Sequence, residues 1–174
     1  MSFADFIAVV ATERLREVAL HWQDARRAKR MPGWRDLDPA ALARQLPIVW
    51  AWKFDAAAQS FVGRLAGEDI NAIFGRSMRG VPMQEYFAGR SYAAIFERHR
   101  RVVAEPCFMH GSGPVFRHLG RHGPGERIIL PLADDGTHGD GVLGATVYRV
   151  APGKADQPPV ADWSAEVATF FPLE

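Results

Sequence analysis

The 174-residue sequence has one cysteine, no long apolar run and a net charge close to zero. A single thiol, Cys107, forms neither an intrachain disulfide nor a thiolate zinc site by itself. The longest apolar stretches, 7–11 and 46–52, are far shorter than the roughly 20 residues that a membrane-spanning helix needs. The N-terminus is acidic within five residues and lacks the basic start of a signal peptide. We therefore expect a cytoplasmic protein without a membrane partner.

Neither sign of charge dominates, because the formal net charge is +1. Residues 76–127 nevertheless carry nine Arg and Lys against four acids, whereas residues 128–174 carry two against seven. No segment is strongly basic, so we expect no nucleic acid partner. The hydrophobic content of 48% supports one globular domain with a little chain left over.

The N-terminal segment predicts one amphipathic helix over about residues 3–30, ending before Pro32-Gly33. At 1.5 Å per residue it would be about 40 Å long. That exceeds what a domain of this size needs as a cover, so the helix either forms a homodimer or lies along its own sheet. The residues expected on the dimer face are Phe3, Phe6, Ile7, Val10, Val18 and Trp22.

The rest of the sequence alternates between strand and helix patterns. A short helix is expected over 39–46, a β-hairpin over 48–54 and 60–66, and helices over 68–74 and 92–104. Further strands are expected at 107–110, 115–119, 127–132 and 142–150, and a terminal helix over 160–171. This order predicts an α+β fold, a five-stranded antiparallel sheet whose helical crossover lies on one face.

The element order and several short motifs resemble those of the PAS domain. The motifs are Asp38-Pro39, Leu46-Pro47, Arg64-Leu-Ala-Gly67, Phe74-Gly75-Arg76, Gly80 and Leu130-Pro131-Leu132. They are similar to a subfamily of short stand-alone proteins common in alphaproteobacteria, which usually has an aromatic residue at the position of Gly63. The resemblance implies a dimerisation or signalling helix over 1–31, a PAS-like domain over 32–150, and a linker with a terminal helix over 151–174.

PAS domains sense small molecules, bind haem or flavin, and dimerise through flanking helices. A pocket between sheet and helices is one interpretation of the apolar residues there, and a filled core is the other. Four arginines are candidates to anchor an anionic ligand: Arg64, Arg76, Arg117 and Arg127. The candidate pocket residues are Trp52, Leu65, Ile70, Ile73, Phe74, Phe96, Leu130 and Val147.

The chemical motifs of most cofactors and enzymes are missing. Flavin photochemistry needs a cysteine on the helix that Ile70–Phe74 forms, and Cys107 lies elsewhere. His99 lies on the long helix but beside Arg98 and Arg100, which favours a partly exposed histidine over a haem ligand. We expect neither haem nor flavin, no metal site and no enzymatic activity. The histidines judged not to hold a metal are His110, His118, His122 and His138.

The sequence therefore predicts a homodimeric sensory or protein-interaction module that regulates a protein partner, with or without a small-molecule ligand. One alternative is an enzyme on the cone-shaped α+β fold of ketosteroid isomerase, which needs an Asp or His inside its cavity. The early hairpin over 48–66 disfavours that fold. A second alternative is a structural adaptor without a ligand.

Overall fold

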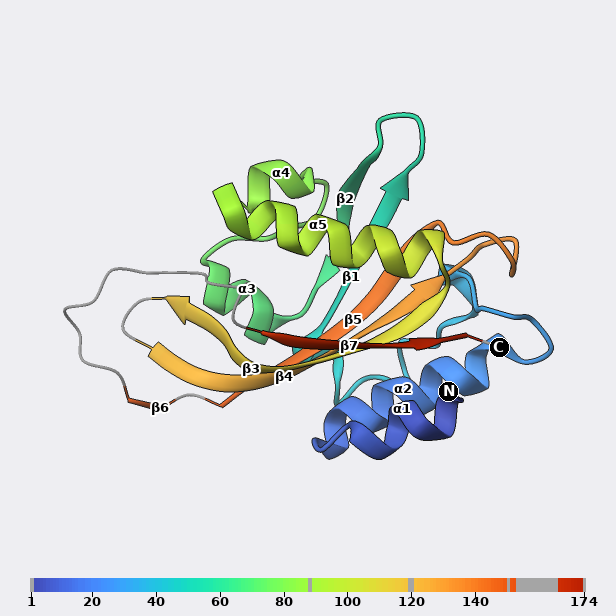
Figure 1. The fold of residues 1–174 in the computed structure, drawn as a ribbon, viewed down its shortest axis with the longest axis horizontal. Coiled ribbons are helices and arrows are strands. Elements are labelled where there is room, and N and C mark those ends of the chain that lie inside the picture. Colours follow the sequence, from blue (N-terminus) through green and yellow to red (C-terminus); the bar gives the residue numbers. More distant parts are fainter. Residues whose placement is uncertain (1, 88, 119–120, 150, 153–165, 174) are drawn as a thin grey trace.

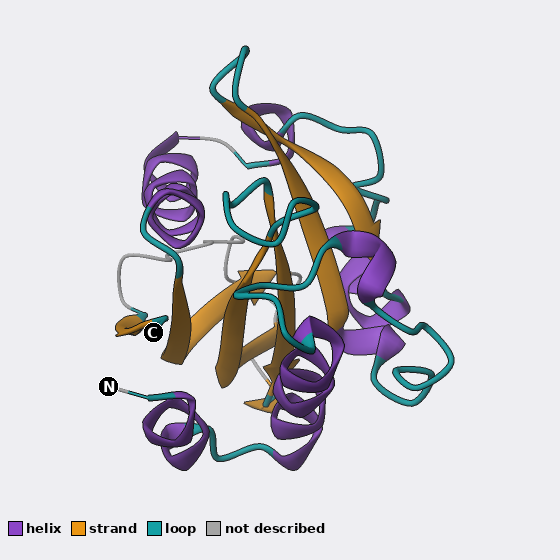
Figure 2. Ribbon diagram, turned by 90° about the vertical axis from the view of Figure 1, so that its right-hand side faces the viewer, coloured by secondary structure: helices purple, strands orange, loops and turns teal. Residues whose placement is uncertain are grey.

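An antiparallel sheet separates two layers of helices in the computed structural model (Figure 1). The structure describes residues 2–87, 89–118, 121–149, 151–152 and 166–173. Figure 2 shows from a second direction that helices lie on both sides of the twisted strands. The helices of the crossover lie on one face, as predicted, and the N-terminal helices cover the other face.

The sheet has the strand order β2-β1-β5-β4-β3-β7. β1 (Val49–Asp55) and β2 (Ser60–Ala66) form the predicted hairpin, and β1 pairs with β5 (Gly141–Tyr148). β4 (Arg121–Leu132) lies between β5 and β3 (Cys107–His118), and β6 (Ala151–Pro152) pairs with β4. The α+β class and the joining of early and late strands in one sheet are confirmed.

Alternate residues of the strands build a separate core on each face. One face packs against α3 (Glu68–Phe74), α4 (Met83–Tyr86) and α5 (Gly89–Ala104), and includes Trp50, Trp52 and Ile129. The other face packs against the N-terminal helices. The strand residues that it buries there include Val49, Ala51, Ile128, Leu130, Leu143 and Ala145.

The N-terminal helical segment is present but is divided into α1 (Phe3–Val9) and α2 (Glu13–Arg26). Between them, the backbone N–H groups of Ala11 and Thr12 donate to the Glu126 carboxylate, at 2.6 and 2.8 Å. The prediction of a single helix over 3–30 was therefore wrong, because the carboxylate of Glu126, far along the chain, accepts the hydrogen bonds of these two N–H groups.

The apolar face of this segment covers the chain's own sheet. Phe6, Val10, Val18 and Trp22 are fully buried in the core of that face, and Phe3 and Ile7 pack against it. Trp22 Nε1 donates to the Pro131 carbonyl oxygen at 2.7 Å. Of the two placements that the sequence allowed, the structure shows the one along the sheet, and the residues assigned to a dimer face belong to the chain's own core.

Three further local predictions were wrong. A helix was predicted over 160–171, but Val167–Pro172 form a strand, β7, which pairs with β3. Residues 160–165 of that prediction lie outside the described residues. The break predicted between 110 and 115 is absent, because β3 continues through it. Residues 39–45 form turns followed by a 3₁₀ turn at Leu46–Ile48 instead of a regular helix.

Gly63, the departure from the subfamily pattern, lies where another backbone approaches β2. Gly63 N–H donates to the Val81 carbonyl, and Gly80 N–H donates to the Gly63 carbonyl, at 3.0 and 2.8 Å. A Cβ at residue 63 would overlap the Met78 carbonyl. Glycine thus lets the segment after α3 pack on the sheet.

Among the described residues, no helix is long and apolar enough to cross a membrane.

Candidate functional site: a cavity between the sheet and helices α3 to α5

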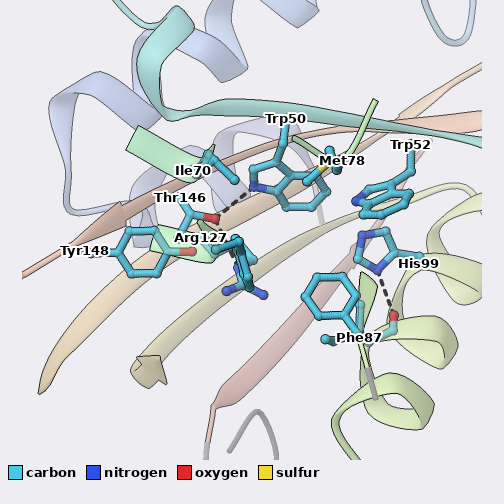
Figure 3. A pocket seen from close by; sticks show the side chains of 11 residues that line it. Trp50, Trp52, Ile70, Met78, Phe87, His99, Arg127, Thr146 and Tyr148 are labelled. Atoms are coloured by element: carbon cyan, nitrogen blue, oxygen red, sulfur yellow. Dashed lines mark hydrogen bonds between the residues drawn. The ribbon is translucent and has the colours of Figure 1, made fainter. Parts of the chain in front are cut away.

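A small cavity lies on the α5 face of the sheet (Figure 3). It has a volume of about 20 Å³, and the empty space around it amounts to about 300 Å³ with its opening to solvent. The smaller volume is sufficient for about one water molecule. The lining is mainly aromatic and aliphatic: Trp50, Trp52, Ile70, Phe74, Met78, Phe87, Ile95, His99, Arg127, Thr146 and Tyr148.

His99 supplies an unpartnered polar atom at this cavity. Its side chain is on α5 and only 2% of the residue is exposed. Nδ1–H donates to the Ile95 carbonyl at 2.7 Å, so the neutral ring carries its lone pair on Nε2. Nε2 is buried and has no hydrogen-bond partner in the described part of the chain. The cavity therefore holds a free acceptor.

The surroundings of His99 keep its ring neutral. Burial lowers the pKa of His99 to about 3; its hydrogen bond to Ile95 opposes this shift, while the positive charges of Arg127 and Arg98 reinforce it. Its ring packs beside those of Trp50 and Phe61, with centroids 5.3 and 5.6 Å away. At neutral pH the group accepts a hydrogen bond but is a weak base.

A polar network from β1, β4 and β5 forms another wall of the cavity. Thr146 Oγ1 accepts hydrogen bonds from Trp50 Nε1 at 2.9 Å and from Arg127 Nε at 3.2 Å (Figure 3). A Cβ at residue 144 would overlap the Trp50 ring, so Gly144 provides the space for that indole. These contacts fix the orientation of Trp50 and of the Arg127 guanidinium.

Arg127 is neutralised by a carboxylate from the C-terminal strand. Glu166, next to β7, forms a close ion pair with Arg98 of α5 and has an oxygen 3.7 Å from Arg127 Nη1. The Arg127 side chain is 3% exposed and the Glu166 side chain is fully buried. Burial lowers the pKa of Arg127, and Glu166 opposes that shift. The cluster therefore links the cavity wall to α5 and β7.

The structure brings some of the predicted pocket residues together and separates others. Trp52, Ile70 and Phe74 line the cavity, and Phe96 packs in the same core. The side chains of Leu130 and Val147 lie on the face of the sheet opposite the cavity. Like Leu65, they pack in the core beneath α1 and α2. Their assignment to the pocket was therefore wrong. The side chain of Ile73 lies outside the described residues.

Of the four candidate anion anchors, Arg127 lies in the cavity wall. The guanidinium of Arg64 lies over the Trp34 ring, 4.3 Å from its centroid. Arg76 packs over the Tyr86 ring and donates to the Glu85 carbonyl at 2.6 Å. The Arg117 side chain lies outside the described residues.

The expected partial exposure of His99 was wrong. Ile95 and Val102, which are four and three residues away on α5, are buried on the same face. Arg98 is directed to Glu166, so its charge does not mark His99 as a surface residue. Trp50, Thr146 and Tyr148 were also not predicted. The sequence did contain a signal for these residues. Trp50 and Trp52 are two residues apart on one strand and so lie on the same face, and Thr146 and Tyr148 alternate with apolar residues of β5.

The donor set at the cavity does not suit a metal ion. No Asp, Glu or Cys lines it, and Arg127 brings a positive charge. No group of three His, Cys, Asp or Glu suited to a metal occurs in the described residues. His110 is paired with Glu126 and His138 with Asp135, while the side chains of His118 and His122 lie outside those residues. A haem or flavin, whose pockets are on the order of several hundred Å³, does not fit a cavity of about 20 Å³.

One solved structure that the comparison matches to this chain is the VqmA–ligand–DNA complex of Vibrio cholera. The two chains are 15% identical with a TM-score of 0.43, and the match covers 63% of this chain and 49% of the other. This chain thus spans about half the length of that protein. The prediction that no nucleic acid takes part is corrected, because the structure matched here includes DNA. The charge balance that carried it does not exclude such a partner.

The search of curated proteins found no match. The family comparison, by contrast, covers most of the chain: the sequence profile described as PAS domain matches residues 10–147. That span includes α2, strands β1 to β4, all of β5 except Tyr148, and every other residue of the cavity lining. PAS domains serve as sensory or interaction modules, and this chain belongs to the PAS domain family.

Proposed function

We propose that this PAS domain is a sensory module that binds a small molecule in the cavity between the sheet and helices α3 to α5. The observation that carries the proposal is the buried Nε2 atom of His99, which has no hydrogen-bond partner among the described residues. A buried polar atom without a partner costs free energy, and a ligand that donates to it recovers that cost. The aromatic wall supplies apolar contact area around this one polar point.

The size and the opening of the cavity restrict the ligand. Among the lining side chains, Phe74 and Tyr148 keep intermediate exposure, which places the opening between the end of α3 and the end of β5. A molecule larger than water requires a neighbour to move. Met78 is suited to this because its unbranched side chain adapts its shape at low cost. The cavity therefore favours a molecule with at most one ring.

The enzyme alternative gains nothing from the buried histidine. A general base works best with a pKa near the working pH, and the pKa of His99 is about 3. The strand order also differs from the long meander expected for the ketosteroid isomerase fold, because β1 lies between β2 and β5. The adaptor alternative predicts that the cavity never holds more than water.

Native mass spectrometry of the freshly purified chain, together with thermal shifts in a library of single-ring compounds, tests the proposal. We expect a bound small molecule or a stabilising compound, and we expect Ile70→Phe to abolish binding by filling the cavity. Leu130→Phe is the matched control, because Leu130 is equally buried but lies on the opposite face of the sheet. A chain that binds none of these compounds, or an I70F variant that binds as well as the original, would contradict the proposal.

A further inference from the structure

We infer that the cavity selects an uncharged, single-ring molecule that donates an O–H or N–H hydrogen bond to His99 Nε2. This inference rests on the proposed function and adds the chemical class of the ligand. Two features of the site carry it: the lone pair of His99 Nε2, which has no partner among the described residues, and the carboxylate that already pairs with the cationic wall.

The first feature makes the site demand a donor. His99 Nδ1–H is already used by the Ile95 carbonyl, 2.7 Å away, so Nε2 presents a lone pair. That atom is buried and lacks a partner in the described residues. A ligand without an O–H or N–H leaves it unsatisfied, and sites built around such a group reject the analogue that lacks the matching donor. A carboxylate would oppose the lone pair with another.

The second feature is that the cation of the cavity wall already has a carboxylate partner within the fold. Arg127 is the cation of the cavity wall, and its charge is met by Glu166, whose side chain is fully buried. Arg98 approaches the same carboxylate from α5 and is 15% exposed, so water shares its charge. An anionic ligand would have to compete with a carboxylate that the fold itself holds in place. A neutral ligand has no such competitor.

The shape of the wall favours a flat ligand. Trp50 and Trp52 come from alternate positions of β1 and both face the cavity, where Phe87 lies across from them (Figure 3). Flat rings pack well against such faces in offset or edge-on arrangements. The inferred ligand is therefore planar and apolar, with one hydrogen-bond donor at its edge.

Phenol, toluene and benzoate are the probes that separate these requirements. Phenol and toluene have nearly the same size, so any side chain that must move for one must move for the other, and only phenol has a donor. We expect phenol to bind at least about tenfold more tightly than toluene, the difference that one satisfied buried acceptor supplies. Benzoate should bind more weakly than phenol. Binding is measured by isothermal titration and by ligand-observed NMR.

Two readouts on His99 complete the test. In the original chain with ¹⁵N-labelled histidine, phenol should shift the Nε2 resonance while Nδ1 keeps its proton, a measurement that needs no variant. In His99→Leu, phenol and toluene should bind equally. Equal binding of the two probes to the original chain, tighter binding of benzoate, or an unchanged Nε2 signal with phenol bound would overturn the donor requirement but leave small-molecule binding intact. If none of the three probes binds, this inference fails, and the mass measurement decides separately on the proposed function.

Discussion

The carboxylate of Glu166 lies over Gly111 so closely that a Cβ atom at residue 111 would overlap it. Gly111 is in β3 opposite Ala168 of β7, and the missing side chain opens a path across the strand. Through it, Glu166 reaches Arg127 on the next strand and Arg98 on α5. One glycine on a neighbouring strand thus permits the ion pairs that connect the C-terminal strand to the cavity.

Substitution of this glycine should therefore weaken the whole C-terminal edge. Gly111→Ala is expected to lower the free energy of unfolding by about 1–3 kcal/mol, because the added methyl group displaces a carboxylate held by two arginines. Urea unfolding followed by tryptophan fluorescence measures the change. Ser112→Ala, at the next residue of β3, is the control and should change stability by at most about 0.5 kcal/mol.

A double-mutant cycle identifies the cause. Glu166→Ala alone should cost about 3–5 kcal/mol, because it leaves the buried Arg127 without its negative partner. In the Glu166→Ala background, G111A should lose most of its effect, since the crowded carboxylate is gone. If the two changes are additive, the close approach of Glu166 is not what makes glycine necessary at residue 111.

The sequence was sufficient to predict the strands of the sheet but not which face of the sheet holds the cavity. The hairpin of β1 and β2 and the helix ending at Gly75 follow from local patterns, and both are present. Leu130 and Val147 were assigned to the wrong face, because apolar alternation shows that a strand has two buried faces without showing which one holds a cavity. The polar Arg127 and Thr146, at the other parity of the same strands, mark that face.

The remaining errors come from contacts between distant parts of the chain. Nothing near Val10 predicts the end of α1, because the carboxylate that accepts from the next two backbone N–H groups belongs to Glu126. Residues 167–171 have spacing compatible with a helix, and pairing with the free edge of β3 makes them a strand. Local propensity is a weak prior that such tertiary contacts override.

Acid should loosen the N-terminal helices through Glu126. Burial raises the pKa of Glu126, but hydrogen bonds from Thr12, His110 and Ala11 outweigh that effect and lower it overall. A carboxyl group with a lowered folded-state pKa stabilises the fold above its ordinary value of about 4.5, and this stability is lost as the pH falls through the folded-state value. Glu126→Gln should cost about 1–3 kcal/mol at pH 7 and show a shallower loss below pH 4.5. Urea unfolding from pH 7 to pH 3 measures both, and parallel curves for the two proteins would contradict the assignment.

Trp22 tests whether the N-terminal segment belongs to the chain's own core. It is fully buried against the sheet, with an edge-to-face contact to Phe108 at 5.0 Å between ring centroids. Trp22→Ala should cost about 3–5 kcal/mol, as expected for a large cavity in a packed core. Leu20, on the same helix, is 48% exposed, and Leu20→Ala should change stability by no more than about 0.5 kcal/mol. A Trp22→Ala variant as stable as the Leu20 control would show that the segment does not need its place on the sheet.

The titration of His99 should appear as a loss of stability in weak acid. Burial lowers its folded-state pKa from 6.5 to about 3, so between these values the unfolded chain takes up a proton at this position and the folded chain does not. The histidine therefore destabilises the fold progressively as the pH falls from about 6.5 toward 3. The stability of the original chain minus that of His99→Leu should decrease over this range in urea unfolding at pH 7.5, 6.0 and 5.0. In ¹⁵N NMR of the folded chain, the ring should stay neutral with its proton on Nδ1 down to about pH 4. A pH-independent difference, or protonation of the ring near pH 6.5, would mean that His99 is open to water and that Nε2 is not the buried acceptor of the cavity.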